Sequence, residues 1–306
     1  MLTKSKRPAD HHLHPSFFII GANKCGTSSL YRYLVSHPNV LPCKKKEPNF
    51  FGQHSPDYIE SHIDDYYGLF PAREHQGDLS FVWEASDAAG RPELTRVQVQ
   101  RDPDRNYITG EASANTFHDV PPALLHKYLP DIKLILLLRN PIDRAYSHYR
   151  MYQRFRASGH DLGFELKDLE TDIIDDLAAY LKTGASHYIS IGIYVDKLRE
   201  WVGQFGWSNI KLVISEELAE TDKAEQIMSS LEDYLEIPHH QFGEILNRRF
   251  NHAPSSGTSV NSFSGLARVR ISESDTTPGV RALLSDFYQP YNRSLAELLG
   301  YDLPWC

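Results

Sequence analysis

The first apolar run of the chain predicts a buried strand that leads into a helix. Residues 17–20 (Phe-Phe-Ile-Ile) carry no polar break and stop at Gly21, which is typical of a strand buried on both faces. Apolar residues then recur at helical spacing between Leu30 and Leu34. His37-Pro38 closes that helix, because proline restricts the residue before it to extended backbone. The chain therefore opens with a strand, a tight loop and a helix.

Two further apolar runs predict two more buried strands. They are Lys133–Leu138 and Ile210–Ile214. Asn140-Pro141 follows the first of them and marks a helix start, since asparagine caps helices and proline suits the first turn. Helical periods or compositions also mark 57–70, 165–182, 194–205, 222–235 and 279–299. Strands that alternate with helices predict an α/β fold with a central, mainly parallel sheet flanked by helices on both faces.

The remaining segments set the expected domain organisation. Residues 1–15 are polar and histidine-rich and are expected to be a disordered leader, with a single domain over 16–306. Within it, 77–107 is expected to be an insertion, and its alternating residues predict a β-hairpin. Residues 247–265 are rich in Ser, Asn and Gly and predict a long loop.

Composition narrows the class of protein. The chain of 306 residues is 41% hydrophobic and 24% charged with a formal net charge of -8, which disfavours a dedicated nucleic-acid binder. Three cysteines are too few for a disulfide framework and match no zinc spacing. No segment has the roughly 18 consecutive apolar residues of a membrane-spanning helix. We therefore expect a soluble, cytoplasmic protein without a membrane span.

The first loop has the chemistry of a phosphate cradle. Residues 21–29 read Gly-Ala-Asn-Lys-Cys-Gly-Thr-Ser-Ser and join a buried strand to a helix. Glycines allow a tight turn in which consecutive N–H groups, beside the positive end of the helix dipole, face one anion. A Walker A loop would place Lys after the second glycine, but here Thr27 stands there and Lys24 precedes Gly26. Lys24 is therefore expected to touch a group attached directly to a 5'-phosphate.

The second strand ends in a cation. Arg139 follows Leu138 at the place where a P-loop NTPase often carries an acid that holds Mg²⁺. Ser147 lies two turns along the next helix, on the face of Asn140. An arginine and a helix-borne hydroxyl together suit a terminal phosphate.

Taken together, the two segments resemble those of the sulfotransferases that use 3'-phosphoadenosine-5'-phosphosulfate (PAPS). The likeness covers roughly residues 16–305 and is strongest to the bacterial and heparan-sulfate branch. Supporting matches are Lys46-Glu47-Pro48-Asn49-Phe50-Phe51, Tyr188 to Tyr194 with Gly192, and Tyr291-Asn292-Arg293-Ser294-Leu295 running to Leu303-Pro304-Trp305. The resemblance implies a P-loop-like domain that transfers a sulfuryl group from PAPS to an acceptor hydroxyl or amine.

The resemblance also implies a role for each site residue. Lys24 contacts the 5'-phosphate and the bridging oxygen, and Glu47 is the general base. The cradle for the 5'-phosphate is the loop with Cys25, Gly26, Thr27, Ser28 and Ser29, whereas Arg139 and Ser147 bind the 3'-phosphate. Arg248 and Arg249 lie where the family closes a basic loop over the cofactor. No metal is implied. Lys44, Lys45 and Lys46 next to Glu47 are candidates for lowering its pKa or for binding the acceptor.

Departures and alternatives accompany this interpretation. The heparan-sulfate branch usually has a lysine after the glutamate of a Glu-Lys-Thr/Ser segment, but this chain reads Glu111-Ala112-Ser113, which disfavours a heavily sulfated acceptor. The alternatives are a P-loop nucleotide kinase and a non-catalytic module that binds a nucleotide or a sulfated sugar. Trp201 and Phe205 are expected to be core, and the histidines to bind no metal. The sequence leaves open whether the acceptor is a carbohydrate or another small metabolite, and it does not indicate the oligomeric state.

Overall fold

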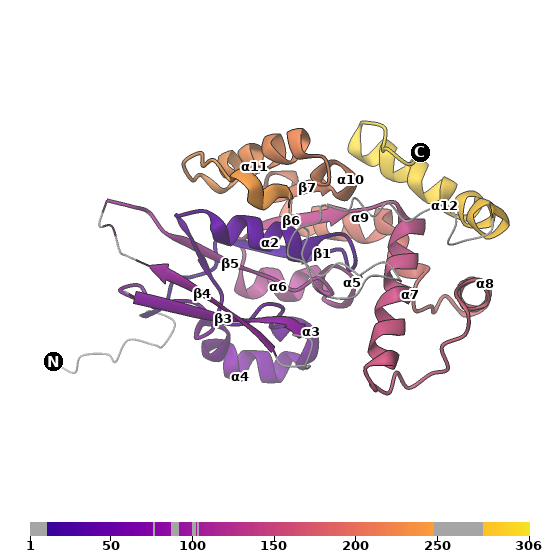
Figure 1. Ribbon diagram of the computed structural model, residues 1–306, viewed down its shortest axis with the longest axis horizontal. Coiled ribbons are helices and arrows are strands. Elements are labelled where there is room, and N and C mark those ends of the chain that lie inside the picture. Colours follow the sequence, from indigo (N-terminus) through magenta and orange to yellow (C-terminus); the bar gives the residue numbers. More distant parts are fainter. Residues whose placement is uncertain (1–10, 76, 87–91, 100–101, 103, 248–277) are drawn as a thin grey trace.

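A five-stranded parallel sheet forms the centre of the computed structural model, which describes residues 11–75, 77–86, 92–99, 102, 104–247 and 278–306 (Figure 1). All of its strand pairs are parallel, in the order β2-β5-β1-β6-β7. The strands are β1 (Phe17–Gly21), β2 (Val40–Pro42), β5 (Ile108–Ala112), β6 (Lys133–Leu138) and β7 (Ile210–Ile214). This arrangement confirms the expected fold class.

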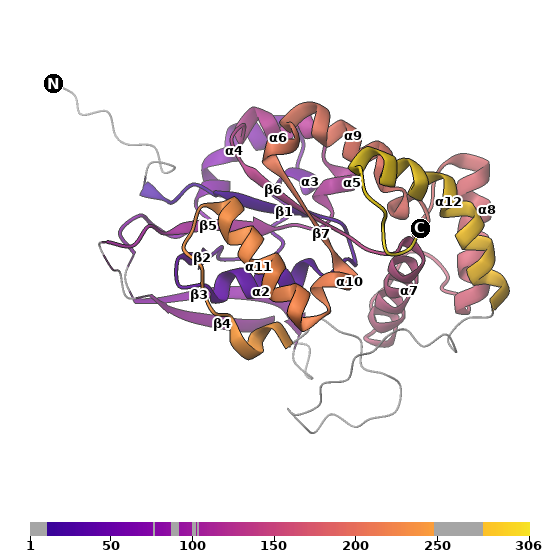
Figure 2. The ribbon, with the colours of Figure 1, turned by 90° about the horizontal axis from the view of Figure 1, so that it is seen from above.

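Helices cover both faces of the sheet, as a parallel sheet requires. Figure 2 shows α2 (Thr27–Ser36) and α11 (Thr221–Leu235) on one face, and α6 (Pro122–Tyr128) and α9 (Tyr194–Phe205) on the other. Beyond one end of the sheet lie α7 (Pro141–Ala157), α8 (Leu169–Thr183) and α12 (Pro278–Leu299). None of the helices in the described residues is long and apolar enough to cross a membrane.

The core consists of the sheet and the apolar sides of these helices. The residues of β1 are all buried, and Leu134 to Leu138 of β6 are completely buried. Trp201 is also fully buried, and its indole N–H donates to the Phe117 carbonyl at 3.0 Å. The expectation that Trp201 and Phe205 belong to the core is therefore confirmed.

The hairpin expected within 77–107 is present. It consists of β3 (Gly77–Ser86) and β4 (Pro92–Val99), which pair antiparallel in a separate two-stranded sheet. The helix expected over 57–70 is α4 (Pro56–Tyr67), capped by the Ser55 side chain. The helix expected from 165 begins later, at Leu169, because the Asp168 side chain accepts the Thr171 N–H and caps it there.

Several short elements were not expected from the sequence. They are β2, β5, α6, the one-turn helices α3 (Phe50–Gln53), α5 (Thr116–Asp119) and α10 (Ser215–Leu218), and the 3-10 turns η1 (Ser190–Gly192), η2 (Trp207–Asn209) and η3 (Gly243–Asn247). β5 reads Ile-Thr-Gly-Glu-Ala, so it lacks the apolar run that marks a buried strand, although all five residues are buried. Its polar groups serve the site described below.

Two expected segments lie partly or wholly outside the described residues. Residues 248–277 are among those not described, so most of the loop expected over 247–265 falls there. Of the expected leader, the structure describes residues 11–15, where His12 pairs with Ala72 and the Leu13 N–H donates to the Pro71 carbonyl at 2.9 Å.

Candidate active site

The loop after β1 turns sharply before it enters α2. Lys24 has φ 69° and Gly26 has φ 95°, both in the left-handed region, and Gly26 is the N-cap of α2. The start of a helix is a general anion site, because its first N–H groups have no carbonyl one turn back and the helix dipole is positive there. In α2 the Ser29 N–H already donates to the Gly26 carbonyl at 3.0 Å. Thr27 and Ser29 are buried in that turn, and Ser28 is half-buried between them. The predicted cradle residues therefore line one tight turn at the start of a helix.

Lys24 lies half-buried among other charges. Burial lowers the pKa of its ammonium group to about 8, and the positive charge of Arg154 adds to this decrease. Glu47 acts in the opposite direction, while Arg139 and Lys46 lower the pKa further. Lys24 is thus mostly charged at neutral pH, and an anion bound beside it would relieve the repulsion from its cationic neighbours.

The end of β6 lies directly against this loop. The Ala22 N–H donates to the Leu137 carbonyl at 2.8 Å, and the Arg139 guanidinium donates to the Lys24 carbonyl at 3.2 Å. β1 and β6 are neighbouring parallel strands, so their carboxyl ends meet at the same edge of the sheet. The lysine-bearing loop and Arg139, which are far apart in the sequence, therefore share one site.

Helix α7 starts at this edge and carries the predicted serine. The Asn140 side chain caps the helix by accepting the Ile142 N–H at 3.0 Å. The Asn140 N–H in turn donates to Glu216 of α10 at 2.9 Å. Ser147 lies two turns along α7 with a half-buried side chain. The predicted order of Arg139, a capped helix start and Ser147 is present.

Cys25 differs from the other loop residues because its side chain points into the protein. The thiol is fully buried, 3.7 Å from the Tyr194 hydroxyl. Burial raises its pKa to about 11, so it remains a neutral thiol. Any contact of Cys25 with a cofactor must therefore come from its backbone, and the side chain fills space in the core.

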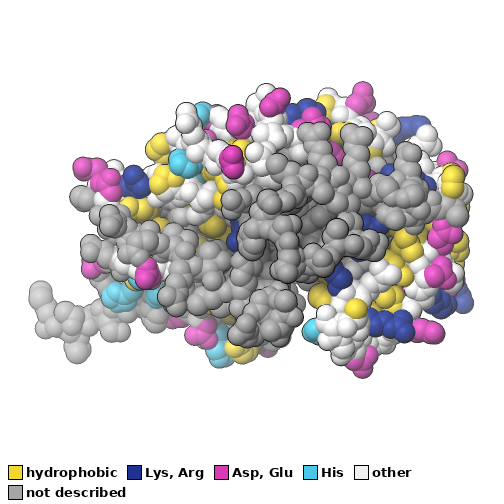
Figure 3. Space-filling view, viewed as in Figure 1, with side chains coloured by type: hydrophobic (Ala, Val, Ile, Leu, Met, Phe, Trp, Pro, Cys, Tyr) yellow, Lys and Arg dark blue, Asp and Glu magenta, His cyan; other side chains and the backbone are white. Residues whose placement is uncertain are grey.

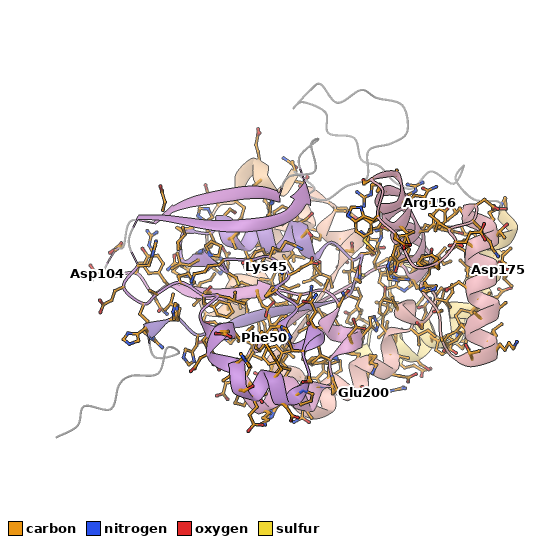
Figure 4. All side chains as sticks on the ribbon, turned by 90° about the horizontal axis from the view of Figure 1, so that it is seen from below. Lys45, Phe50, Asp104, Arg156, Asp175 and Glu200 are labelled. Carbon is orange, nitrogen blue, oxygen red and sulfur yellow. The ribbon has the colours of Figure 1, made fainter. Side chains whose placement is uncertain are left out.

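The turn after β2 presents Glu47 to the same edge of the sheet. Glu47 has φ 55° and a half-buried side chain, and its carboxylate pairs with the ammonium of Lys46, which is buried. Lys44 instead donates to the Gly68 carbonyl at 2.6 Å, and Lys45 is exposed. Figure 4 labels Lys45 and Phe50, the residues on either side of this turn. Of the three lysines considered as partners, Lys46 is the one that pairs with Glu47.

The sequence analysis did not predict a place in the site for two sets of residues that lie near it. Arg154 lies on α7 seven residues after Ser147, which is two helical turns, and this spacing was a usable signal. Its Nε is buried and has no hydrogen-bond partner among the described residues. The other set is Glu111 and Ser113 at the end of β5, where burial raises the pKa of the Glu111 carboxyl to about 7.

Basic side chains extend beyond Lys24. Figure 3 shows Lys and Arg side chains along the part of the surface that α7 occupies in Figure 1. Arg154 and Arg156 are in the last turn of that helix, and Figure 4 labels Arg156. Arg248 and Arg249, predicted to cover the cofactor, lie outside the described residues. In the part of the chain that is described, no group of three or more His, Cys, Asp or Glu side chains is placed to hold a metal ion.

Comparison with protein families gives one match over most of the chain. The family described as sulfotransferase domain matches residues 14–283. Human carbohydrate sulfotransferase 15 is 25% identical over 94% of this chain and 53% of its own length. Mouse heparan sulfate glucosamine 3-O-sulfotransferase 6 is 25% identical over 95% of this chain and 73% of its own. The chain thus spans about half the length of the first of these relatives.

Solved structures share the fold. A sulfotransferase from Alicyclobacillus acidocaldarius superposes with a TM-score of 0.59 at 22% identity, over 95% of this chain and 98% of that one. A mouse sulfotransferase complexed with PAP, which is the PAPS product adenosine 3',5'-bisphosphate, gives a TM-score of 0.52 at 12% identity over 93% and 86%. These likenesses show the P-loop-like sulfotransferase fold.

Proposed function

Because the chain belongs to the sulfotransferase family, we propose that it transfers the sulfuryl group of PAPS to a hydroxyl or amine of a carbohydrate or small metabolite. One observation carries the proposal. Arg139 donates to the Lys24 carbonyl at 3.2 Å, so the two predicted phosphate sites lie side by side. One adenosine nucleotide with phosphates at both its 5' and its 3' position fits such a pair.

The residues present fit the donor. Lys24 and Gly26 shape a tight turn at the start of a helix, and such a turn beside an ammonium group suits the 5'-phosphosulfate. Arg139 and Ser147 suit the 3'-phosphate, since a guanidinium and a hydroxyl both donate hydrogen bonds to phosphate oxygens. Arg154 brings a further cation close to Lys24, with a buried Nε that no described residue satisfies. The site therefore combines several positive charges and hydrogen-bond donors, which suits a ligand with anionic groups at both its 5' and its 3' position.

The chemistry divides between Lys24 and Glu47. Glu47 accepts the proton of the acceptor hydroxyl while the acceptor oxygen bonds to sulfur. The bond between sulfur and the 5'-phosphate oxygen breaks in line with this attack, and PAP leaves with the electron pair. Lys24 stabilises the charge that builds on the leaving oxygen. The Lys46 ammonium pairs with the Glu47 carboxylate beside the proposed site of proton transfer.

The relatives support a carbohydrate as the acceptor class. Their names include a carbohydrate sulfotransferase and a heparan sulfate glucosamine 3-O-sulfotransferase. The identities of 25% leave room for a different acceptor within the class. A cytoplasmic location remains a prediction from the sequence.

The chain lacks the acid that a P-loop kinase would often carry at the end of β6, since Arg139 stands there. Glu216, a carboxylate near this strand end, uses one oxygen to accept the Asn140 N–H at 2.9 Å at the start of α7. The experiment that separates the possibilities has two arms. In the first, thermal unfolding is followed with PAP, with ATP and Mg²⁺, and without ligand. Saturation at about 100 Kd stabilises a protein by about 2.7 kcal/mol, and we expect this for PAP alone.

In the second arm, labelled PAPS is incubated with a panel of saccharides and small hydroxylated metabolites. Label transferred to an acceptor supports the sulfotransferase. Stabilisation by PAP without transfer to any acceptor would favour a binding module, and stabilisation by ATP and Mg²⁺ alone would favour a kinase.

A further inference from the structure

The segment that follows β5 touches both catalytic elements. The Asn115 side-chain oxygen accepts a hydrogen bond from the Asn23 amide at 2.7 Å, and Asn23 precedes Lys24. The Ser113 hydroxyl accepts the Asn49 N–H at 3.0 Å, and Asn49 is two residues after Glu47. Residues 111–115 therefore connect the lysine loop to the turn of the base.

That turn has a backbone that needs outside support. Glu47 and Asn49 have φ values of 55° and 51°, in the left-handed region that residues with side chains rarely occupy. Each such residue costs about 1–3 kcal/mol and persists only where its surroundings hold it. The Asn49 side-chain amide donates to the Glu47 carbonyl at 3.2 Å, which closes the turn on itself. The Asn49 N–H bond to Ser113 then ties the turn to the sheet.

A buried carboxyl sets the direction of the Ser113 hydroxyl. Ser113 donates to Glu111 at 2.5 Å, so its single hydrogen is engaged and its lone pairs face the Asn49 N–H. The other Glu111 oxygen accepts the Tyr66 hydroxyl at 2.9 Å. Glu111, Ser113 and Tyr66 are all completely buried, where hydrogen bonds are strong and an unpaired group is costly.

Tyr66 also contacts the helix that follows the turn of Glu47. The Tyr66 ring packs against Phe50 and Phe51 of α3, with ring centroids 5.3 Å and 4.9 Å apart. α3 begins directly after Asn49. The turn of Glu47 is thus held by Ser113 through its backbone and by Tyr66 through the helix that follows it.

We propose that Ser113 and Glu111 are positioning residues, which fix the Glu47 carboxylate by holding the Asn49 N–H. The inference rests on the proposed function, in which Glu47 is the base. Both residues are completely buried, so neither is exposed to a donor or an acceptor. Both act through the Asn49 backbone, so they should set the rate of transfer without setting the affinity for PAPS.

The test compares three substitutions at residue 113 with a matched control. Ser113→Ala should lower kcat about 10²-fold, as a displaced catalytic group does, while the KM for PAPS and the Kd for PAP stay unchanged. Ser113→Thr keeps the hydroxyl and should restore most of the rate. Ser113→Cys keeps the volume but offers only a weak acceptor, so it should lose rate even if the alanine variant does not fold.

The control is Thr109→Val in the same strand. Thr109 is fully buried and its hydroxyl donates to the Leu41 carbonyl at 2.8 Å, so this change also removes a buried hydroxyl but leaves the Glu47 turn alone. It should lower the melting temperature and leave kcat unchanged.

Amide hydrogen exchange at Asn49 supplies a readout that does not depend on activity. Exchange should speed up in Ser113→Ala and Ser113→Cys and stay slow in Ser113→Thr and Thr109→Val. Unchanged exchange, or a kcat in the alanine and cysteine variants equal to that of the control, would overturn the positioning role. If exchange speeds up in Ser113→Ala and Ser113→Cys but the wild-type protein turns over no PAPS, the contact holds and the proposed function fails instead.

Discussion

Lys24 holds a positive charge in a crowded, half-buried position, and the proposed chemistry depends on that charge. Lys24→Ala should lower kcat by about 10²–10³-fold, the usual cost of removing a group that stabilises charge in a transition state. Initial rates of labelled sulfuryl transfer measure this. Lys182→Ala, at an exposed position in the last turn of α8, is the matched control and should behave like the wild type. A mild effect of Lys24→Ala would remove it from the mechanism.

The pH dependence should show the titration of Lys24. Because its pKa is lowered to about 8, kcat/KM for PAPS should fall as the pH rises through about 8 and the ammonium loses its proton. Arg154→Gln removes a neighbouring positive charge, so the pKa of Lys24 should rise and the alkaline limb should move to higher pH. A pH–rate profile of both proteins measures the limb. A limb that stays in place would mean that another group titrates there.

Glu47 should be needed for turnover and not for nucleotide binding. Glu47→Gln keeps the size of the side chain and removes the base, so kcat should fall by about 10²–10⁴-fold. The thermal shift with PAP should be unchanged, which separates binding from chemistry. Glu60→Gln, an exposed acid on α4, serves as the control. Full turnover by Glu47→Gln would assign the proton transfer to another group.

Among single residues, the sequence predicted those that belong to a motif. It did not predict those whose role depends on a contact formed only in the folded chain. Lys24 and Arg139 stand in recognisable segments, and the structure brings them together. Glu111 and Ser113 were known only as a departure from the family pattern. Their role depends on a hydrogen bond to Asn49, which no spacing along the chain reveals.

Among the elements, the 3-10 turn η1 packs closely against α7 and α12. An added Cβ at Gly192 would lie 2.7 Å from the Tyr288 hydroxyl and 2.9 Å from Cβ of Pro141. Gly192→Ala should therefore destabilise the protein by about 1–3 kcal/mol through overpacking. Thermal unfolding measures this. Gly203→Ala in α9 has open space around the new methyl group, so it should be neutral or stabilising. Equal melting temperatures would contradict this packing.

The elements with strong apolar patterns were predictable, and the short polar ones were not. β1, β6 and β7 have apolar runs, and their predicted bounds hold to within a residue. β5 escaped notice because Gly110 and Glu111 break its pattern, each for a structural reason. An added Cβ at Gly110 would lie 2.4 Å from the Phe17 carbonyl oxygen, so only glycine allows β5 this close to β1. The buried Glu111 carboxyl accepts hydrogen bonds from the hydroxyl groups of Tyr66 and Ser113. Tyr66 is distant in the sequence, and no pattern marks Ser113 as a partner.

In the whole molecule, parallel topology explains why two distant segments form one site. Neighbouring parallel strands end at the same edge, so the loop after β1 and the start of α7 after β6 must meet there. β5, on the other side of β1, adds the Ser113 contact to the same edge. The sequence predicted this convergence once the sheet was taken to be parallel, but it did not indicate that the segment after β5 contacts the turn of Glu47.

The central claim is that one nucleotide occupies both phosphate sites, and a crystal structure of the protein with PAP tests it most directly. We predict the 5'-phosphate within hydrogen-bond distance of Lys24 and the α2 start, and the 3'-phosphate of the same molecule on Arg139 and Ser147. A nucleotide that touches only one of these two groups, or that binds elsewhere, would contradict the account.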